Sequence, residues 1–362
     1  MPIFRNQQVI EVARGIKAFL NLSAGVTRGK VPSLDANSAS SGGQADGPMA
    51  EQLKRMRNEL AWKEEENSRL RSRLNSSEEF KGISPERIIW ITGSGRSGSS
   101  WLTAMMADLK SHSRWNEPHL GSLFGNLYYL HSGERNRSRD DFVLGERYKE
   151  SWINAVRRFI LEAANVRFPE LSEAGHLVVK EPNGAIGTPI VMDALPESRL
   201  VLLIRDPRDV ASSALMAQKK GSWGNEWKAD GNKNESLADT DPDKFVWHWA
   251  NAAYLPGVQR AKEAFERHKA PKSVIRYEDL RYDTLETMRR LYRDLEVRVD
   301  EGQLRKAVEK HAWENIPEEK KGENKTQRKA KPGGWREDLA PAQIRVVEQV
   351  AGSIIDEFYP SQ

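Results

Sequence analysis

The sequence predicts an α/β fold with a mostly parallel central sheet, helices on both faces and a helical extension in front of it. Four short runs have the apolar, β-branched character of buried strands: residues 88–91, 176–180, 200–204 and 273–277. Amphipathic stretches at residues 152–163 and 285–297 are expected to be helices. Strands that alternate with helices favour a parallel sheet, because each parallel pair needs a crossover connection.

The first 80 residues differ in composition from the main domain, which is expected at residues 84–362. Residues 1–31 contain an amphipathic helix that could contact a membrane through residues 1–20, although an ordinary docking helix or chain end is favoured. Residues 32–48 are rich in serine, glycine and alanine and are expected to be a flexible linker. Residues 49–80 carry an a/d repeat, which fits a short coiled coil forming a homo-oligomer as well as it fits a solvated helix.

Composition restricts the class of protein. The 362 residues include no cysteine, which excludes disulfides and thiolate metal sites and suits a reducing compartment. We therefore expect a cytoplasmic protein, membrane-peripheral if the N-terminal helix binds lipid. The net charge of +4 is too small to favour a nucleic-acid partner. No apolar run near the N-terminus is long enough for a membrane span, so neither a transmembrane anchor nor a secretion signal is expected.

The strongest functional signal is a glycine-rich turn between a predicted strand and a predicted helix. Residues 88–91 form the strand, Gly93, Gly95 and Gly98 follow among serines, and apolar residues at helical spacing begin at Trp101. Glycines let the backbone approach a ligand closely, and the first amides and the dipole of the helix favour an anion. The stretch therefore predicts a phosphate-binding loop.

Two well-known nucleotide motifs match this loop only in part. Gly93 and Gly98 have the spacing of the nucleotide-triphosphatase loop, but Ser99 occupies the lysine position. The three glycines also fit the dinucleotide fingerprint, which expects an acidic residue at the end of a second strand. Glu117 lies at about the right distance, but the polar sequence SHSRWNE before Pro118 is not expected to be a strand. Neither motif is therefore assigned.

Further candidates follow other predicted strands. Lys180 ends the second apolar run, and ligands of parallel sheets bind where strands end. Arg205 ends the third run, and Ser213 lies eight residues after it. Arginine has the planar fork that suits phosphate. Glu117 and His119 lie where the chain returns towards the loop; they are either proton acceptors or parts of a polar turn.

These residues together resemble the sulfotransferases that use 3′-phosphoadenosine 5′-phosphosulfate (PAPS). The stretch from Arg96 to Ser100 is similar to the 5′-phosphosulfate loop of carbohydrate and tyrosyl-protein sulfotransferases. The arginine and serine eight residues apart match the family's 3′-phosphate motif, and Tyr277-Glu-Asp matches a third motif. Residues 328–339, RKAKPGGWREDL, resemble the fourth motif, with Ala330 in place of a glycine and Gly334 in place of an aspartate.

The resemblance implies a fold, a reaction and a set of site residues. It implies the P-loop-like sulfotransferase fold and sulfuryl transfer from PAPS to an acceptor hydroxyl of a carbohydrate or a peptide, with 3′-phosphoadenosine 5′-phosphate (PAP) as product and no metal. The implied catalytic residues are Arg96, Glu117 as the base, His119 as its reserve, and Lys180 at the leaving oxygen. The implied cofactor-binding residues are Gly95, Arg96, Ser97, Gly98, Ser99, Ser100, Trp101, Arg205, Ser213, Tyr277, Arg328, Lys329 and Ala330.

Two other functions remain as alternatives at this point. A P-loop kinase or other nucleotide-binding protein would need the missing lysine and an acidic magnesium ligand. A non-catalytic nucleotide-binding scaffold would not need Glu117 or Lys180. The polar stretch 218–244 is expected to be a mobile, structureless loop near the acceptor. Its Trp223 and Trp227, with the nearby Trp247, would stack on sugar rings or belong to the core, and the core is favoured.

Overall fold

The computed structural model describes most of the chain from Gly82 onwards: residues 82–131, 133–171, 174–226, 236–322, 325 and 329–360. The predicted segments 1–31, 32–48 and 49–80 lie outside the described residues, as do Trp227 and Arg328. Among the described residues, no helix combines the length and the apolar character needed to cross a bilayer.

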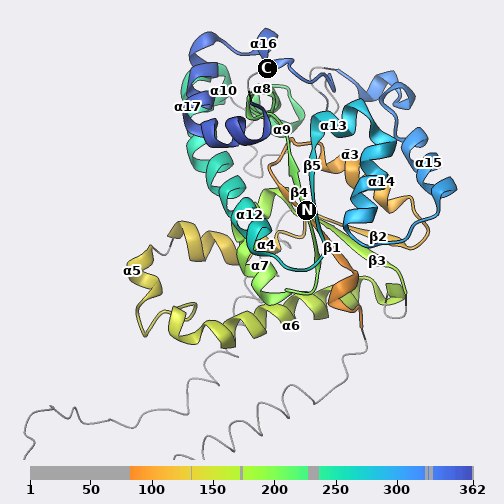
Figure 1. The fold of residues 1–362 in the computed structure, drawn as a ribbon. Coiled ribbons are helices and arrows are strands. Elements are labelled where there is room, and N and C mark those ends of the chain that lie inside the picture. The colour runs from red at the N-terminus through yellow and green to blue at the C-terminus, as the bar shows by residue number, and fades with distance from the viewer. Residues whose placement is uncertain are drawn as a thin grey trace, which may run out of the picture. The chain divides into compact units, whose positions relative to one another are not determined.

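The centre of the fold is one sheet of five parallel strands in the order β2-β3-β1-β4-β5 (Figure 1). All four strand pairs are parallel, which confirms the predicted α/β class. All six residues of β1 are buried, as expected for a central strand covered on both faces. The strand bounds are β1 Ile88–Gly93, β2 His112–Asn116, β3 His176–Lys180, β4 Arg199–Ile204 and β5 Lys272–Arg276.

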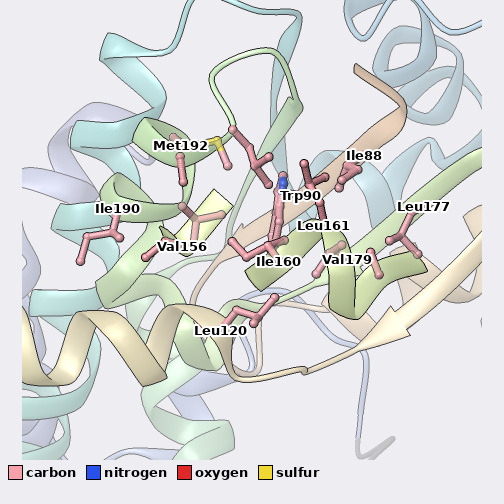
Figure 2. Close-up of a cluster of buried hydrophobic side chains, with 14 of the residues drawn as sticks. Ile88, Trp90, Leu120, Val156, Ile160, Leu161, Leu177, Val179, Ile190 and Met192 are labelled. Carbon is pink, nitrogen blue, oxygen red and sulfur yellow. The ribbon is translucent and has the colours of Figure 1, made fainter. Parts of the chain in front are cut away.

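Helices cover both faces of the sheet (Figure 1). On one face, α6 (Lys149–Arg167), α7 (Thr188–Ala194) and α12 (Leu255–Arg267) enclose an apolar cluster that includes Trp90 and Ile160 (Figure 2). On the other face, α3 (Ser99–Ala107), α14 (Thr284–Asp294) and α15 (Glu301–Lys310) pack against strand residues such as Ile91 and Val178. The central strands β1 and β3 therefore place alternate side chains into two separate cores.

The other helical segments are shorter or lie around the ends of the strands. A third apolar cluster includes residues of α8, α11 and α17 next to β4. The bounds are η2 Pro85–Arg87, α4 Leu120–Gly125, η3 Asn126–His131, α5 Glu134–Arg137, η4 Glu146–Tyr148, η5 Pro169–Leu171, η6 Pro182–Gly187, α8 Pro207–Gln218, α9 Trp223–Glu226, α10 Leu237–Thr240, α11 Pro242–His248, η7 Trp249–Tyr254, α13 Tyr277–Tyr282, η8 Trp313–Asn315, η9 Glu318–Lys320, α16 Trp335–Asp338 and α17 Pro341–Phe358.

Two predictions about local structure were wrong. The polar stretch before Glu117 forms β2, an edge strand that pairs only with β3 and exposes alternate residues. Glu117 therefore does follow a second strand. The dinucleotide fold places its first two strands side by side, but here β3 lies between β1 and β2, so the strand order differs from that fold. The described parts of the stretch 218–244 contain α9, α10 and the start of α11 and are not structureless.

The strand order creates a crevice between β1 and β4. After β1 the chain passes through α3 towards β2, and after β4 it passes through α8 and α12 towards β5, on the other side of β1. The connections thus diverge at the carboxyl ends of two neighbouring strands, where ligands bind in open parallel sheets.

A buried pair of histidines lies at the opposite end of the sheet. His112 on β2 and His176 on β3 are neighbours in register, and their rings stack with centroids 5.1 Å apart. The edge of the Tyr292 ring packs against His112 at 5.6 Å. Burial lowers the pKa of His112 to about 4, with a further contribution from the charge of His176. Burial and the nearby Arg199 also lower the pKa of His176 to about 4.

We predict that this pair makes the fold sensitive to acid. In the unfolded chain the histidines take up protons near pH 6.5, whereas in the folded chain they do so only near pH 4. Folding free energy is therefore lost as the pH falls from 6.5 to 4. In urea titrations over this range, His112→Gln should lose less stability than the wild type, by on the order of 2 kcal/mol. The exposed His119→Gln is the control, and equal pH slopes for wild type and His112→Gln would contradict the prediction.

Candidate active site

The glycine-rich loop connects β1 to the start of α3. Arg96 and Gly98 adopt left-handed backbone conformations, with φ angles of 68° and 92°. A Cβ atom on Gly98 would lie 2.6 Å from the ring of Tyr277, so only glycine fits there. The Ser97 hydroxyl donates to the Ser94 carbonyl at 2.7 Å and closes the loop. No side chain caps the amino end of α3, so its first amides are placed to bind an anion.

A cavity of about 220 Å³ opens beside this loop. Ten of the thirteen predicted cofactor-binding residues line it: Arg96, Gly98, Ser99, Ser100, Trp101, Arg205, Ser213, Tyr277, Lys329 and Ala330. Gly95 and Ser97 belong to the loop but do not line the cavity, and Arg328 lies outside the described residues. The structure therefore brings together segments that are far apart in the sequence.

Cations dominate the polar part of the cavity wall. Arg205 donates to the Arg96 carbonyl at 3.1 Å and stacks on the Tyr277 ring, with its guanidinium carbon 4.3 Å from the ring centroid. The Nε of Arg96 donates to the Ser213 hydroxyl at 3.0 Å, and its guanidinium lies over the Trp223 ring. Lys329 adds a third positive charge and pairs with Asp338 at 2.7 Å. Such a wall is suited to phosphate groups.

Asp209 attaches the C-terminal loop to this wall. Its carboxylate accepts hydrogen bonds from the amides of Gly333 at 2.7 Å and Trp335 at 3.0 Å. Burial raises the pKa of Asp209, while Arg205 and these amides oppose that shift. Ala330 lies in the same loop with a φ of 47°, a left-handed conformation that costs a residue with a Cβ atom some strain.

Several lining residues were missed by the sequence analysis: Arg281, His311, Trp313, Ile316, Lys331 and Gly334. Arg281 lies one helical turn after Tyr277 in α13, so its spacing from that residue could have revealed it. Trp313 lies two residues after His311, whose carbonyl accepts a hydrogen bond from Nε1 of Trp101 at 2.7 Å. This tertiary contact holds the segment that contains Trp313 next to α3. No sequence pattern identifies a contact of that kind.

Lys180 lies at the end of β3, next to the cavity. Its Nζ is 2.6 Å from Oε1 of Glu117 and donates to the Ser100 hydroxyl at 3.0 Å and to Oδ1 of Asn116 at 3.2 Å. The residue is only 5% exposed, so it is not a solvated strand end. Burial of an ammonium group requires such partners. Lys180 therefore connects the start of α3 to the segment after β2.

Glu117 has a partner on each carboxylate oxygen. Besides the ion pair with Lys180, its Oε2 accepts a hydrogen bond from Nδ2 of Asn183 at 2.8 Å. Its amide donates to the Lys180 carbonyl at 2.8 Å, and its φ of 47° is left-handed. A non-glycine residue in that conformation indicates local strain, which is common at functional sites. A quarter of its side chain remains exposed, so a ligand can reach it.

Two other candidate bases lie nearby but differ in environment. His119 is exposed and has a φ of 61°; within the described ranges, no hydrogen bond links its ring to Glu117 or Lys180. Glu181 is buried, and burial raises its pKa to about 8, so its carboxyl group is mostly protonated at neutral pH. The geometry therefore favours Glu117 over both.

Among the described residues, no cluster of three or more metal-ligating side chains occurs.

Several solved structures are similar to this chain. Solved structures with a similar fold include the mouse sulfotransferase SULT7A1 complexed with PAP, at 12% identity, with 77% of this chain and 86% of that chain covered and a TM-score of 0.46. Another is the sulfotransferase STF9 from Mycobacterium avium, at 13% identity, with coverage of 76% and 78% and a TM-score of 0.47. A third is the sulfotransferase domain from the curacin biosynthetic pathway, at 16% identity, with coverage of 74% and 98% and a TM-score of 0.41.

The sequence itself provides the family assignment. No curated protein matches the chain. The model of the sulfotransferase family matches residues 89–301, from within β1 to the start of α15, which is more than half of the chain. That range contains the glycine-rich loop, Glu117, Lys180, Arg205 and Tyr277. The resemblance inferred from the motifs is thereby confirmed, and the chain belongs to the sulfotransferase family.

Proposed function

We propose that this enzyme transfers the sulfuryl group of PAPS to an acceptor hydroxyl and releases PAP. The observation that carries the proposal is the Lys180–Glu117 pair, 2.6 Å apart, beside a cation-lined cavity that begins at a glycine-rich loop. The two parts supply what sulfuryl transfer needs: sites for two phosphates and a carboxylate for the acceptor's proton. The mouse relative complexed with PAP supports the same choice of nucleotide.

The proposed donor site has two phosphate-binding ends. At one end, the amides of residues 95–100, Arg96 and the hydroxyls of Ser99 and Ser100 would hold the 5′-phosphosulfate. At the other, Arg205, Ser213 and Lys329 would hold the 3′-phosphate, with Arg328 as a further candidate beyond the described residues. The aromatic rings of Trp101 and Tyr277, 6.3 Å apart edge to face, are suited to the adenine base, with Trp313 beside them.

In the proposed reaction, each residue handles a particular charge. The acceptor oxygen attacks sulfur in line, the bond from sulfur to the bridging oxygen breaks, and the acceptor's proton passes to the Glu117 carboxylate. Negative charge grows on the bridging oxygen, where Lys180 and the amides of α3 would stabilise it. Sulfuryl transfer resembles phosphoryl transfer in that positioning and electrostatics provide most of the catalysis.

We infer that the acceptor is a carbohydrate or a peptide. The Arg96-Ser-Gly-Ser-Ser loop supports this choice, because it is similar to that of enzymes acting on those acceptors. Trp223 lies over Arg96 and offers an aromatic surface near the reacting groups. A screen with radiolabelled PAPS tests the proposal, using an unsulfated chondroitin oligosaccharide, an acidic tyrosine peptide and 2-naphthol as acceptors. Labelling of the oligosaccharide or the peptide is expected, and labelling of the phenol alone would contradict it.

One prediction from the proposed function concerns the nucleotide. Because two phosphate sites are proposed, PAP should bind at least about thirtyfold more tightly than adenosine 5′-phosphate, as loss of charge-assisted hydrogen bonds would imply. Isothermal titration calorimetry of both nucleotides measures this ratio. Arg205→Ala should weaken PAP binding strongly and adenosine 5′-phosphate binding little. Equal affinities in the wild type would remove the 3′-phosphate site from the proposal.

Another prediction from the proposed function concerns the base. Glu117→Gln keeps the shape of the side chain and removes its basicity, so turnover should fall about a hundredfold or more. Its PAP affinity should change by less than about threefold, since the nucleotide site is not altered. His119→Ala is the matched comparison and should remain close to wild-type activity. An active Glu117→Gln enzyme beside an inactive His119→Ala enzyme would transfer the role to the histidine.

A further inference from the structure

Asn183 is an exposed residue in a segment that is otherwise buried. It lies in η6, the short helix Pro182–Gly187 that follows Lys180, and every other residue of η6 is buried. Asn183 is exposed, and its side chain points to the segment that contains Glu117, since its Nδ2 donates to Oε2 of that carboxylate at 2.8 Å. A polar, solvent-accessible side chain of this kind, between two groups of the proposed reaction, calls for an explanation.

The main chain and the side chain of Asn183 are both held in place. The Ser122 hydroxyl of α4 donates to the Asn183 carbonyl at 3.1 Å. On the other side, the Asn183 amide oxygen packs against the glycine-rich loop, because a Cβ atom on Gly95 would lie 2.8 Å from Oδ1. The amide group thus lies between the glycine-rich loop and Glu117.

The two oxygens of Glu117 therefore have different partners. Oε1 faces the Lys180 ammonium at 2.6 Å, and Oε2 faces the neutral Asn183 amide at 2.8 Å. Lys180 has two further oxygen partners, on Ser100 and Asn116. Its ammonium group can therefore turn away from Oε1 of Glu117 and still have hydrogen-bond partners. The side chain of Asn183 makes its one hydrogen bond among the described residues to the Glu117 carboxylate.

We propose that Asn183 is a positioning residue that fixes the Glu117 carboxylate and directs Oε1 to the acceptor's proton. The inference rests on the proposed function. When Lys180 follows the charge growing on the bridging oxygen, Oε2 stays hydrogen-bonded and the carboxylate keeps its orientation. Oε1 then takes the proton as the acceptor oxygen bonds to sulfur and the sulfur–bridging oxygen bond breaks. A held carboxylate loses less rotational freedom on reaching the transition state.

The test is a double-mutant cycle with single-turnover and steady-state kinetics. Asn183→Asp keeps the shape but replaces the donor with a like charge next to Glu117, and Asn183→Ala removes the amide. Each is made in the wild type and in Glu117→Gln. The assay uses radiolabelled PAPS and whichever of the chondroitin oligosaccharide, the tyrosine peptide and 2-naphthol is turned over fastest. Ser122→Ala is the control, because it loses the bond to the Asn183 main chain only.

We expect Asn183→Asp and Asn183→Ala to lower kcat about 10- to 100-fold, with acceptor KM and PAP affinity changed less than about threefold. In the Glu117→Gln background neither should lower kcat further, since a residue that acts through the base has no effect once the base is gone. Ser122→Ala should keep near-normal kcat. Melting temperatures show whether either Asn183 variant is poorly folded. If one of them is, the kcat of the other Asn183 variant tests the inference.

Two outcomes would overturn the inference, and they differ from failure of the proposed function. A normal kcat in a folded Asn183 variant would show that the amide does not position the base. If an Asn183 substitution lowers kcat by the same factor in the wild type and in Glu117→Gln, Asn183 has a structural or acceptor-binding role instead. If the wild type transfers no label to any acceptor, the proposed function itself fails, and the inference fails with it.

Discussion

The ion pair between Lys180 and Glu117 is the constraint on which the rest of the site depends. Lys180 is 5% exposed, and an ammonium group at that depth is stable only with oxygen partners around it. Those partners come from the start of α3, from the end of β2 and from Glu117. The ends of three strands therefore meet at one point, and Glu117 adopts a left-handed backbone conformation there.

The parallel sheet makes this convergence compatible with a nucleotide site. All five strands end at the same edge, so Lys180, Arg205 and Tyr277 reach one region although they are far apart in the chain. Residues that follow β1 and β4 line the cavity, and Asp209 attaches the C-terminal loop to its wall. In the proposed reaction, the cations along the cavity bind the nucleotide and the ion pair carries out the transfer.

The sequence allowed prediction of those parts of the fold and site that depend on local pattern. The strands β1, β3, β4 and β5 are apolar runs, and most of the cavity residues belong to motifs with fixed spacing. β2 was missed because an edge strand buries only alternate residues and can be polar. Trp313 and Asn183 were missed because their positions depend on contacts between distant segments, which no local pattern encodes.

The most direct measurement of the central claim is a crystal structure of the full chain with PAP bound. The account predicts that the 5′-phosphate contacts the first amides of α3 and lies within hydrogen-bonding distance of Lys180. It also predicts that Arg205 and Ser213 bind the 3′-phosphate and that Glu117 remains accessible from the acceptor side. PAP bound outside this cavity, or with its 3′-phosphate at Lys180, would contradict the account.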